Sequence, residues 1–164
     1  MNILAIPGKM PATKAWLQSV LSGTTLSKQN IKCHQFIAWN NDQEFDVDSE
    51  ANELPAGHYD LLITKSIGTL IALKSSKVTY DKLIFIGVAL SLYSDKDKEL
   101  LVSLKDKSIS VLIIQENHDP FGFFDEIKSV MGKNNNIQCV EVTGEHHQYK
   151  NVEELSRIID TWLH

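Results

Sequence analysis

Short apolar runs alternate along this chain with longer stretches in which hydrophobic residues recur at helical spacing. The apolar runs predict strands at residues 2–6, 31–37, 60–64, 82–88, 109–114 and 137–142. The amphipathic stretches predict helices at residues 12–21, 66–76, 95–104, 121–131 and 151–163. Strands and helices that alternate in this way are typical of a parallel sheet covered by helices on both faces.

The strands themselves indicate burial on both sides. Residues 83–88 read Leu-Ile-Phe-Ile-Gly-Val, whereas a strand with one face in water would alternate apolar and polar positions. We therefore predict a three-layer α/β sandwich on a mostly parallel sheet of about six strands. A chain of 164 residues has room for one such unit, so residues 1–164 are expected to form a single domain.

Composition excludes several classes of function. A net charge of -5, with no basic stripe, argues against nonspecific nucleic-acid binding. No apolar stretch approaches the ~20 residues of a membrane span, and the first strand starts without a signal-peptide pattern, so we expect a cytoplasmic protein. The two cysteines, Cys33 and Cys139, are predicted to be buried thiols rather than disulfide or metal ligands.

An acidic segment precedes the third predicted strand and superficially resembles a calcium loop. Its carboxylates fall on the ligand positions of an EF-hand frame, but Val47 occupies the sixth position, where the tight turn requires glycine. A solvated acidic loop with a short helix is the better interpretation. We predict no metal site and no cofactor.

Ser66 lies where the strand at 60–64 passes into the helix at 66–76 with almost no connecting loop. A serine at so sharp a turn is forced outward, as a nucleophile needs to be. Residues 64–68 match the G-x-S-x-G nucleophile elbow at Ser66 and Gly68, while Thr64 stands in place of the first glycine. A serine that only caps a core helix is the structural alternative.

Serine catalysis needs a base within hydrogen-bond reach and an acid that orients the base. Asp119 follows the strand at 109–114, and His146 and His147 follow the strand at 137–142. Parallel strands place their carboxyl ends at one edge of the sheet, so these side chains are expected to meet Ser66 there.

The strings around these residues resemble those of the α/β-hydrolase superfamily, especially its small members without a lid. There the strand before the acid often ends in H-G-x-x-D-P, which residues 115–120 match at Asp119 and Pro120. The last strand often ends in G-x-D-H-x-[FY], which residues 144–149 match except at His146. The start of the chain resembles the family's first strand followed by H-G-x, with Pro7 in place of the histidine.

The resemblance implies the strand order 2-1-3-4-5-6 and a triad of Ser66, Asp119 and His147. It also implies an oxyanion hole formed by the backbone N–H groups of Ile67 and of Lys9 or Met10. 

Some assignments stay open at this point. His146 is an alternative base, and Glu116 and Glu145 are alternative acids. The segment between residues 89 and 109 is too short for a cap domain, so we expect an open site. Apolar residues near this edge are candidates for an acyl pocket: Leu90, Leu92, Tyr93, Phe121, Phe123 and Phe124.

The function predicted from these features is that of a serine hydrolase acting on a small ester, thioester or related acyl substrate. The departures from the family pattern at Pro7, Thr64, Gln115 and Glu116 keep a catalytically silent binding module as an alternative. A flavodoxin-type domain that binds a ligand without covalent chemistry is a third interpretation. The sequence carries no indication of an oligomeric state.

Overall fold

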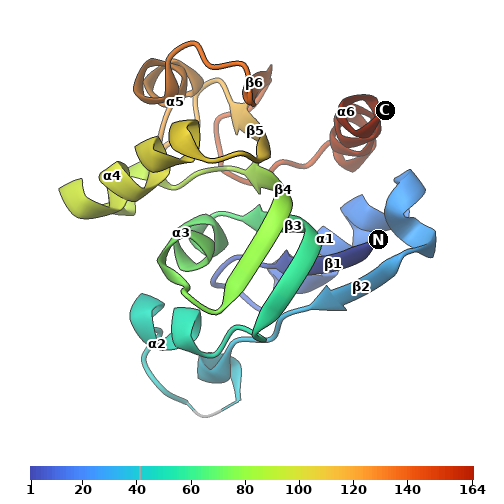
Figure 1. Ribbon diagram of the computed structural model, residues 1–164, viewed down its shortest axis with the longest axis vertical. Coiled ribbons are helices and arrows are strands. Elements are labelled where there is room, and N and C mark those ends of the chain that lie inside the picture. Colours follow the sequence, from blue (N-terminus) through green and yellow to red (C-terminus); the bar gives the residue numbers. More distant parts are fainter. Residues whose placement is uncertain (41) are drawn as a thin grey trace.

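The computed structural model describes residues 1–40 and 42–164. Its centre is a six-stranded sheet in which every neighbouring pair is parallel, in the order β2-β1-β3-β4-β5-β6 (Figure 1). The predicted fold class and strand order are therefore confirmed. The strands are β1 (Asn2–Ile6), β2 (Asn30–Cys33), β3 (Gly57–Lys65), β4 (Val78–Ile86), β5 (Ser110–Glu116) and β6 (Ile137–Val142).

Helices cover both faces of the sheet and make it the middle of three layers (Figure 1). One face is covered by two helices, α1 (Ala12–Ser22) and α6 (Val152–Leu163). The other face is covered by four, α2 (Val47–Asn52), α3 (Ile67–Lys74), α4 (Asp95–Val102) and α5 (Phe124–Met131). A separate hydrophobic core lies between the sheet and the helices on each face.

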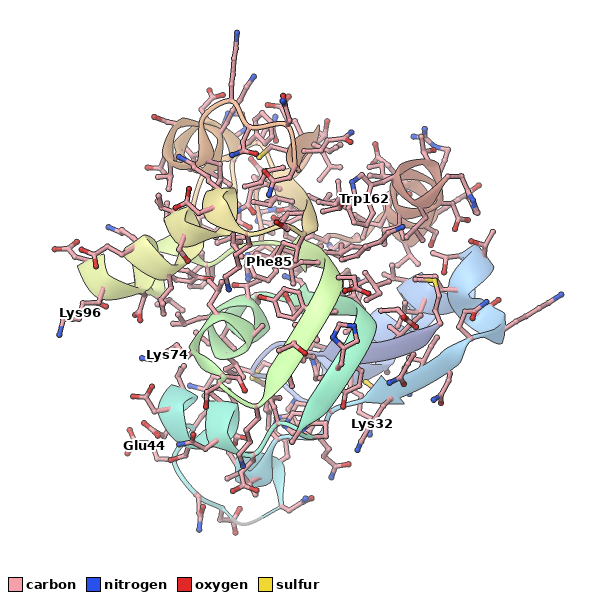
Figure 2. All side chains as sticks on the ribbon, viewed as in Figure 1. Lys32, Glu44, Lys74, Phe85, Lys96 and Trp162 are labelled. Carbon is pink, nitrogen blue, oxygen red and sulfur yellow. The ribbon has the colours of Figure 1, made fainter. Side chains whose placement is uncertain are left out.

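Successive side chains of the inner strands point to opposite faces of the sheet, so each strand contributes to both hydrophobic cores. Leu61 and Ile63 pack beneath α1 and α6, while Leu62 between them packs beneath the opposite helices, and all three are fully buried. Burial of each such side chain contributes roughly 1.5–3 kcal/mol relative to exposure. Figure 2 shows Phe85 of β4 lying within the molecule, whereas the labelled Glu44 and Lys96 point outward.

Strand β2 is shorter than predicted and ends at Cys33 rather than at residue 37. The His34 N–H still donates to the Ala5 carbonyl at 2.8 Å, and the chain then leaves the sheet. Phe36 turns inward and packs edge-to-face against Trp39 and Phe45. Tertiary packing of this aromatic side chain therefore ends a run that sequence alone assigned to the strand.

Several other element ends also differ from the predicted bounds, and two of them have a clear local reason. Strand β4 stops at Ile86 because Gly87 adopts a φ of 68°, in the left-handed region where glycine is favoured. Helix α5 begins at Phe124 rather than 121, because the preceding residues form a loop that holds the proposed acid.

The acidic segment before β3 is largely the solvated loop with a short helix, α2, that the sequence predicted, and one of its carboxylates is buried. Glu50 on α2 is buried, and its carboxylate accepts hydrogen bonds from the N–H groups of Ile37 (3.0 Å) and Ala38 (2.9 Å). This carboxylate therefore supports the turn after β2. Within the described residues, no three His, Cys, Asp or Glu side chains are grouped as metal ligands.

Cys33 and Cys139 are free thiols, as predicted, but both are half-buried rather than buried. They lie on β2 and β6, the two edge strands, which are covered less completely than the central ones. Across residues 1–40 and 42–164, no helix has the length and apolar character needed to cross a membrane.

Candidate active site

The turn between β3 and α3 holds Ser66 in an unusual backbone conformation, with φ 55° and ψ -123°. The Ser66 N–H donates to the Ile86 carbonyl at 3.0 Å, which fixes the turn to the neighbouring strand. A side chain at Gly68 would approach the Pro7 carbonyl oxygen to 2.5 Å, so only glycine lets α3 pack this close to the end of β1. The elbow predicted from the sequence is present, with Thr64 buried in the strand before it.

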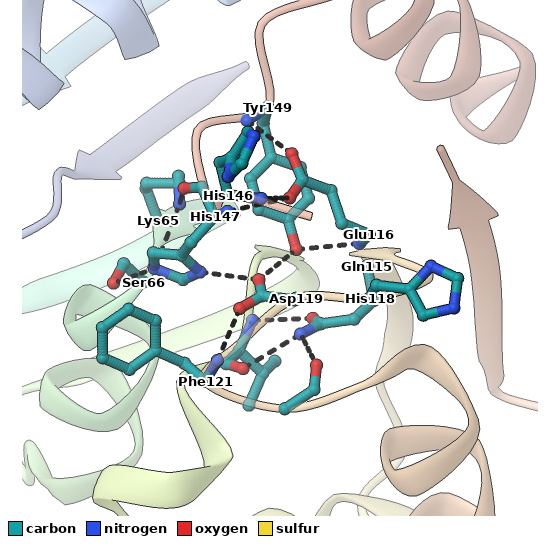
Figure 3. Close-up of polar contacts among 12 residues, drawn as sticks. Lys65, Ser66, Gln115, Glu116, His118, Asp119, Phe121, His146, His147 and Tyr149 are labelled. Atoms are coloured by element: carbon teal, nitrogen blue, oxygen red, sulfur yellow. Dashed lines mark hydrogen bonds and ion pairs between the residues drawn. The ribbon is translucent and has the colours of Figure 1, made fainter. Parts of the chain in front are cut away.

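Three side chains from distant parts of the sequence meet at the carboxyl edge of the sheet (Figure 3). The Ser66 Oγ lies 2.6 Å from Nε2 of His147, and Nδ1 of the same ring lies 2.6 Å from Oδ2 of Asp119. An imidazole in this position can take the serine proton at Nε2 while the carboxylate holds Nδ1–H. The structure thus brings together the serine, base and acid that the sequence singled out.

Asp119 is fully buried and held by several donors. Burial alone raises the pKa of this carboxyl group, but hydrogen bonds from His147, the Phe121 N–H and the Tyr149 hydroxyl outweigh it and lower the pKa below its usual value. Asp119 is therefore an anion in the folded protein at neutral pH, as an orienting acid must be.

The loop that carries the base has a strained backbone, because His147 (φ 60°) and Tyr149 (φ 52°) are both left-handed. The carboxylate of Glu116, at the end of β5, holds this loop. It accepts hydrogen bonds from the N–H groups of His147 (2.9 Å), Tyr149 (2.8 Å) and His146 (3.3 Å). A side chain at Gly144 would collide with this carboxylate, so glycine leaves room for it.

These contacts place the alternative residues outside the hydrogen-bonded chain. Glu116 binds backbone N–H groups instead of an imidazole nitrogen. The His146 ring is 67% exposed and lies 3.5 Å from Glu145. It borders the cavity in front of Ser66, but within the described residues no hydrogen bond joins it to Ser66 or Asp119. The sequence pattern alone could not separate the two histidines, because only the loop conformation decides which ring turns inward.

Gln115 occupies a position where the family-like string has histidine, and its role is positional. Its Oε1 accepts from the Val88 N–H at 2.8 Å, and its Nε2 donates to the carbonyls of Val88 (3.1 Å) and Gly122 (2.7 Å). The buried amide therefore ties the end of β4 to the loop of Asp119.

Tyr149 connects the acid to the strand before it. Its hydroxyl donates to Oδ2 of Asp119 at 2.8 Å and accepts from the Glu116 N–H at 2.9 Å. The Tyr149 carbonyl in turn accepts from Nε1 of Trp16 on α1 at 3.1 Å. The sequence marked this position only as an aromatic that matched the family string, with no role attached.

We expect Tyr149→Phe to lower the unfolding free energy by about 1–3 kcal/mol, because the buried Glu116 N–H is left without an acceptor. Loss of one of the donors to Asp119 is also expected to reduce turnover, on the order of tenfold. Urea denaturation and hydrolysis of a short p-nitrophenyl ester measure the two effects. A variant as stable and active as the wild type contradicts this role of the hydroxyl.

The loop after β1 lies beside the elbow, as the sequence predicted for Lys9 and Met10. A side chain at Gly8 would come within 3.4 Å of Cβ of Ser66. The Lys9 carbonyl accepts from Nε1 of Trp39 at 2.7 Å, and the Thr13 hydroxyl lies 2.8 Å from the Gly8 carbonyl oxygen. Since the N–H and C=O of a trans peptide point in opposite directions, the N–H groups of Lys9 and Met10 face away from these partners.

The N–H of Ile67 opens helix α3, so it has no intrahelical acceptor. Within the described residues, neither this group nor the N–H groups of Lys9 and Met10 donate to another backbone carbonyl. The expected oxyanion donors are therefore available.

A cavity of about 720 Å³ opens in front of Ser66. Of the residues predicted to form an acyl pocket, Leu92 and Phe121 line it, while Leu90, Tyr93 and Phe124 are buried in the core. Phe123 is 47% exposed and packs edge-to-face against His118. Four apolar residues of the wall come from the first third of the chain and were not predicted from the sequence: Ala12, Trp16, Phe45 and Val47.

Lys65 also lines this cavity, immediately before the nucleophile, and its side chain is almost fully buried. Sequence reasoning gave it no role, since a lysine at a strand end is usually solvated. Its placement is the least expected feature of the site.

Comparison of the chain with protein-family models, curated proteins and solved structures finds no match.

Proposed function

We propose that this protein is a serine hydrolase that cleaves a small ester, thioester or related acyl substrate through an acyl-enzyme intermediate. The observation that carries the proposal is the continuous chain of hydrogen bonds from Ser66 through His147 to Asp119, with 2.6 Å at each link. A serine is a weak nucleophile until an oriented base removes its proton, and this chain supplies the base and its orientation. Membership of the α/β-hydrolase superfamily is part of the same proposal.

Acylation follows from the arrangement. Oγ of Ser66 attacks the substrate carbonyl carbon while its proton passes to Nε2 of His147, and the carbonyl electron pair moves onto the oxygen. The N–H groups of Ile67 and of Lys9 or Met10 bind this oxyanion. When the intermediate collapses, the leaving group departs with the proton from His147, and the acyl group stays on Ser66.

Deacylation repeats the sequence with water. His147 takes a proton from a water molecule, whose oxygen attacks the acyl carbon, and the proton then returns to Oγ of Ser66 as the acid product leaves. Asp119 stabilises the charged imidazole during both halves without itself being protonated. The reaction needs only these side chains, the backbone donors and water.

The cavity in front of Ser66 favours a small or extended acyl group with apolar character. Its wall includes Ile67, Leu92 and Phe121 close to the nucleophile and Trp16 from α1. Between β4 and β5 the chain forms α4 and short turns, which leaves no cap domain in that segment to enclose a bulky substrate.

Labelling with a fluorophosphonate probe, followed by peptide mapping, tests the proposal directly. We expect one label, on the peptide that contains Ser66, and none on the Ser66→Ala variant. Ser91→Ala is a suitable control, because its exposed serine belongs to the loop near the cavity but lies outside the triad.

An unlabelled wild-type protein contradicts the proposal and favours a catalytically silent binding module instead. A label on a different serine contradicts the assignment of the nucleophile. Esterase activity that survives in Ser66→Ala has the same consequence.

A further inference from the structure

Lys65 is the last residue of β3, and its ammonium group lies underneath the loop of His147 (Figure 3). Only 3% of the residue is exposed. Its Nζ donates to the His147 carbonyl at 3.1 Å and lies 3.4 Å from Nε2 of the same residue. The rings of Tyr149 and Trp16 are also close to the cation, with their centres 4.5 Å and 5.7 Å from Nζ.

Burial of this lysine is energetically unfavourable. Among the described residues, no carboxylate lies within ion-pair distance of Nζ. Desolvation lowers the pKa of Lys65 to about 8, although the negative charges of Asp119 and Glu116 partly oppose the change. A buried cation without a close counter-ion destabilises a fold, so a contribution to stability does not account for it.

The charges around the imidazole indicate what the lysine does. The titratable groups that face His147 come from three segments: Lys65 at the end of β3, Glu116 and Asp119 at and after β5, and Tyr149 in its own loop. The neighbouring His146 ring is largely exposed. At rest this buried group contains two carboxylates and one ammonium. Without the ammonium, two uncompensated negative charges would favour the charged form of the imidazole, which cannot accept a proton from serine.

We propose that Lys65 is a positioning residue of the triad: its ammonium group holds the His147 backbone and offsets the second buried carboxylate, so that the imidazole stays neutral and acts as a base. This inference rests on the proposed hydrolase function. It adds a fourth residue that controls the pH range in which Ser66 is reactive.

The rate of fluorophosphonate labelling of Ser66, measured from pH 5 to 9, tests the inference. In Lys65→Met, which keeps the apolar stem and removes the charge, we expect the acidic limb of the profile to move up by about one pH unit or more. The rate at pH 6 then falls about tenfold or more and recovers as the pH rises. Lys65→Arg retains the charge and is expected to keep the wild-type limb.

Stability provides a readout that separates this role from a structural one. Lys65→Met is expected to melt at a higher temperature than the wild type at pH 7, because it no longer buries an ammonium group. The pKa of Lys65 is about 8 in the folded protein, whereas the pKa of an unperturbed lysine is 10.5. Between these two pH values the unfolded chain binds more protons than the folded protein, so the stability of the wild type rises with pH. The difference in stability between Lys65→Met and the wild type therefore becomes smaller as the pH rises.

Lys82→Met is the matched control, since Lys82 also lies over an aromatic ring, Trp162, but in the middle of β4, before the carboxyl edge of the sheet that carries the triad. It should leave the labelling profile unchanged. Three results would overturn the role of Lys65. The acidic limb of the pH profile stays in place in Lys65→Met, or it moves equally in Lys65→Arg, or Lys65→Met is less stable than the wild type at pH 7. A wild type that is never labelled overturns the hydrolase function, and this inference with it.

Discussion

Replacement of His147 by alanine is expected to lower turnover of a short p-nitrophenyl ester on the order of 10⁶-fold, the size of effect seen when a serine protease loses its base. Within the part of the chain that the structure describes, the His147 ring is the only group hydrogen-bonded to Oγ of Ser66, at 2.6 Å, and it can accept the serine proton. Nothing else in the chain of hydrogen bonds replaces it. KM should change little, because the imidazole acts on the reacting atoms more than on the acyl group.

His146→Ala is the control for this prediction, because it removes the neighbouring histidine from the same loop. Its ring is largely exposed at the border of the cavity and is not hydrogen-bonded to the triad within the described residues. We therefore expect less than about threefold loss, and backbone contacts of the loop with Glu116 should persist. The reverse pattern shows that the other ring is the base. Modest and equal losses in both variants contradict a catalytic histidine and favour the silent binding module.

Asp119→Asn is expected to reduce turnover by about 10⁴-fold, as loss of the orienting carboxylate does in a serine protease. An amide has nearly the same shape, but it can present an N–H to Nδ1 of His147. The ring then carries its proton on Nε2 and can no longer accept one from Ser66. Circular dichroism and steady-state kinetics together separate this effect from unfolding.

The control is Glu145→Gln, which changes an exposed carboxylate near the same loop and should keep nearly full turnover. A second informative variant is Glu116→Gln, whose amide group would face backbone N–H donors and loosen the His147 loop. If Asp119→Asn is almost as active as the wild type while either of these variants is inactive, the orienting acid is a different residue.

The order of strands and helices could be predicted because burial leaves a strong pattern in this sequence. Inner strands such as β4 and β5 are apolar on both faces, and the fully buried apolar residues in each strand fall within the apolar run that predicted it. Boundaries were less accurate where one side chain overrides the pattern, as Phe36 does after β2 and Gly87 does after β4.

The triad was predictable for a topological reason, since parallel strands bring their carboxyl ends together wherever the strands lie in the sequence. The residues that hold the triad were not predictable. Glu116, Tyr149 and Lys65 act through a left-handed loop, and no periodicity in the sequence signals such a conformation. A buried lysine or carboxylate reads in a sequence like any surface charge.

The positions of the triad residues along the chain also determine when during synthesis the site can form. Ser66 and His147 are 81 residues apart, and the strands that position the acid and the base, β5 and β6, complete one edge of the sheet. A growing chain that has reached β4 already contains the nucleophile but neither its base nor its acid. We expect such a nascent protein to be chemically inert until the ribosome has delivered Tyr149 and the last strands have docked.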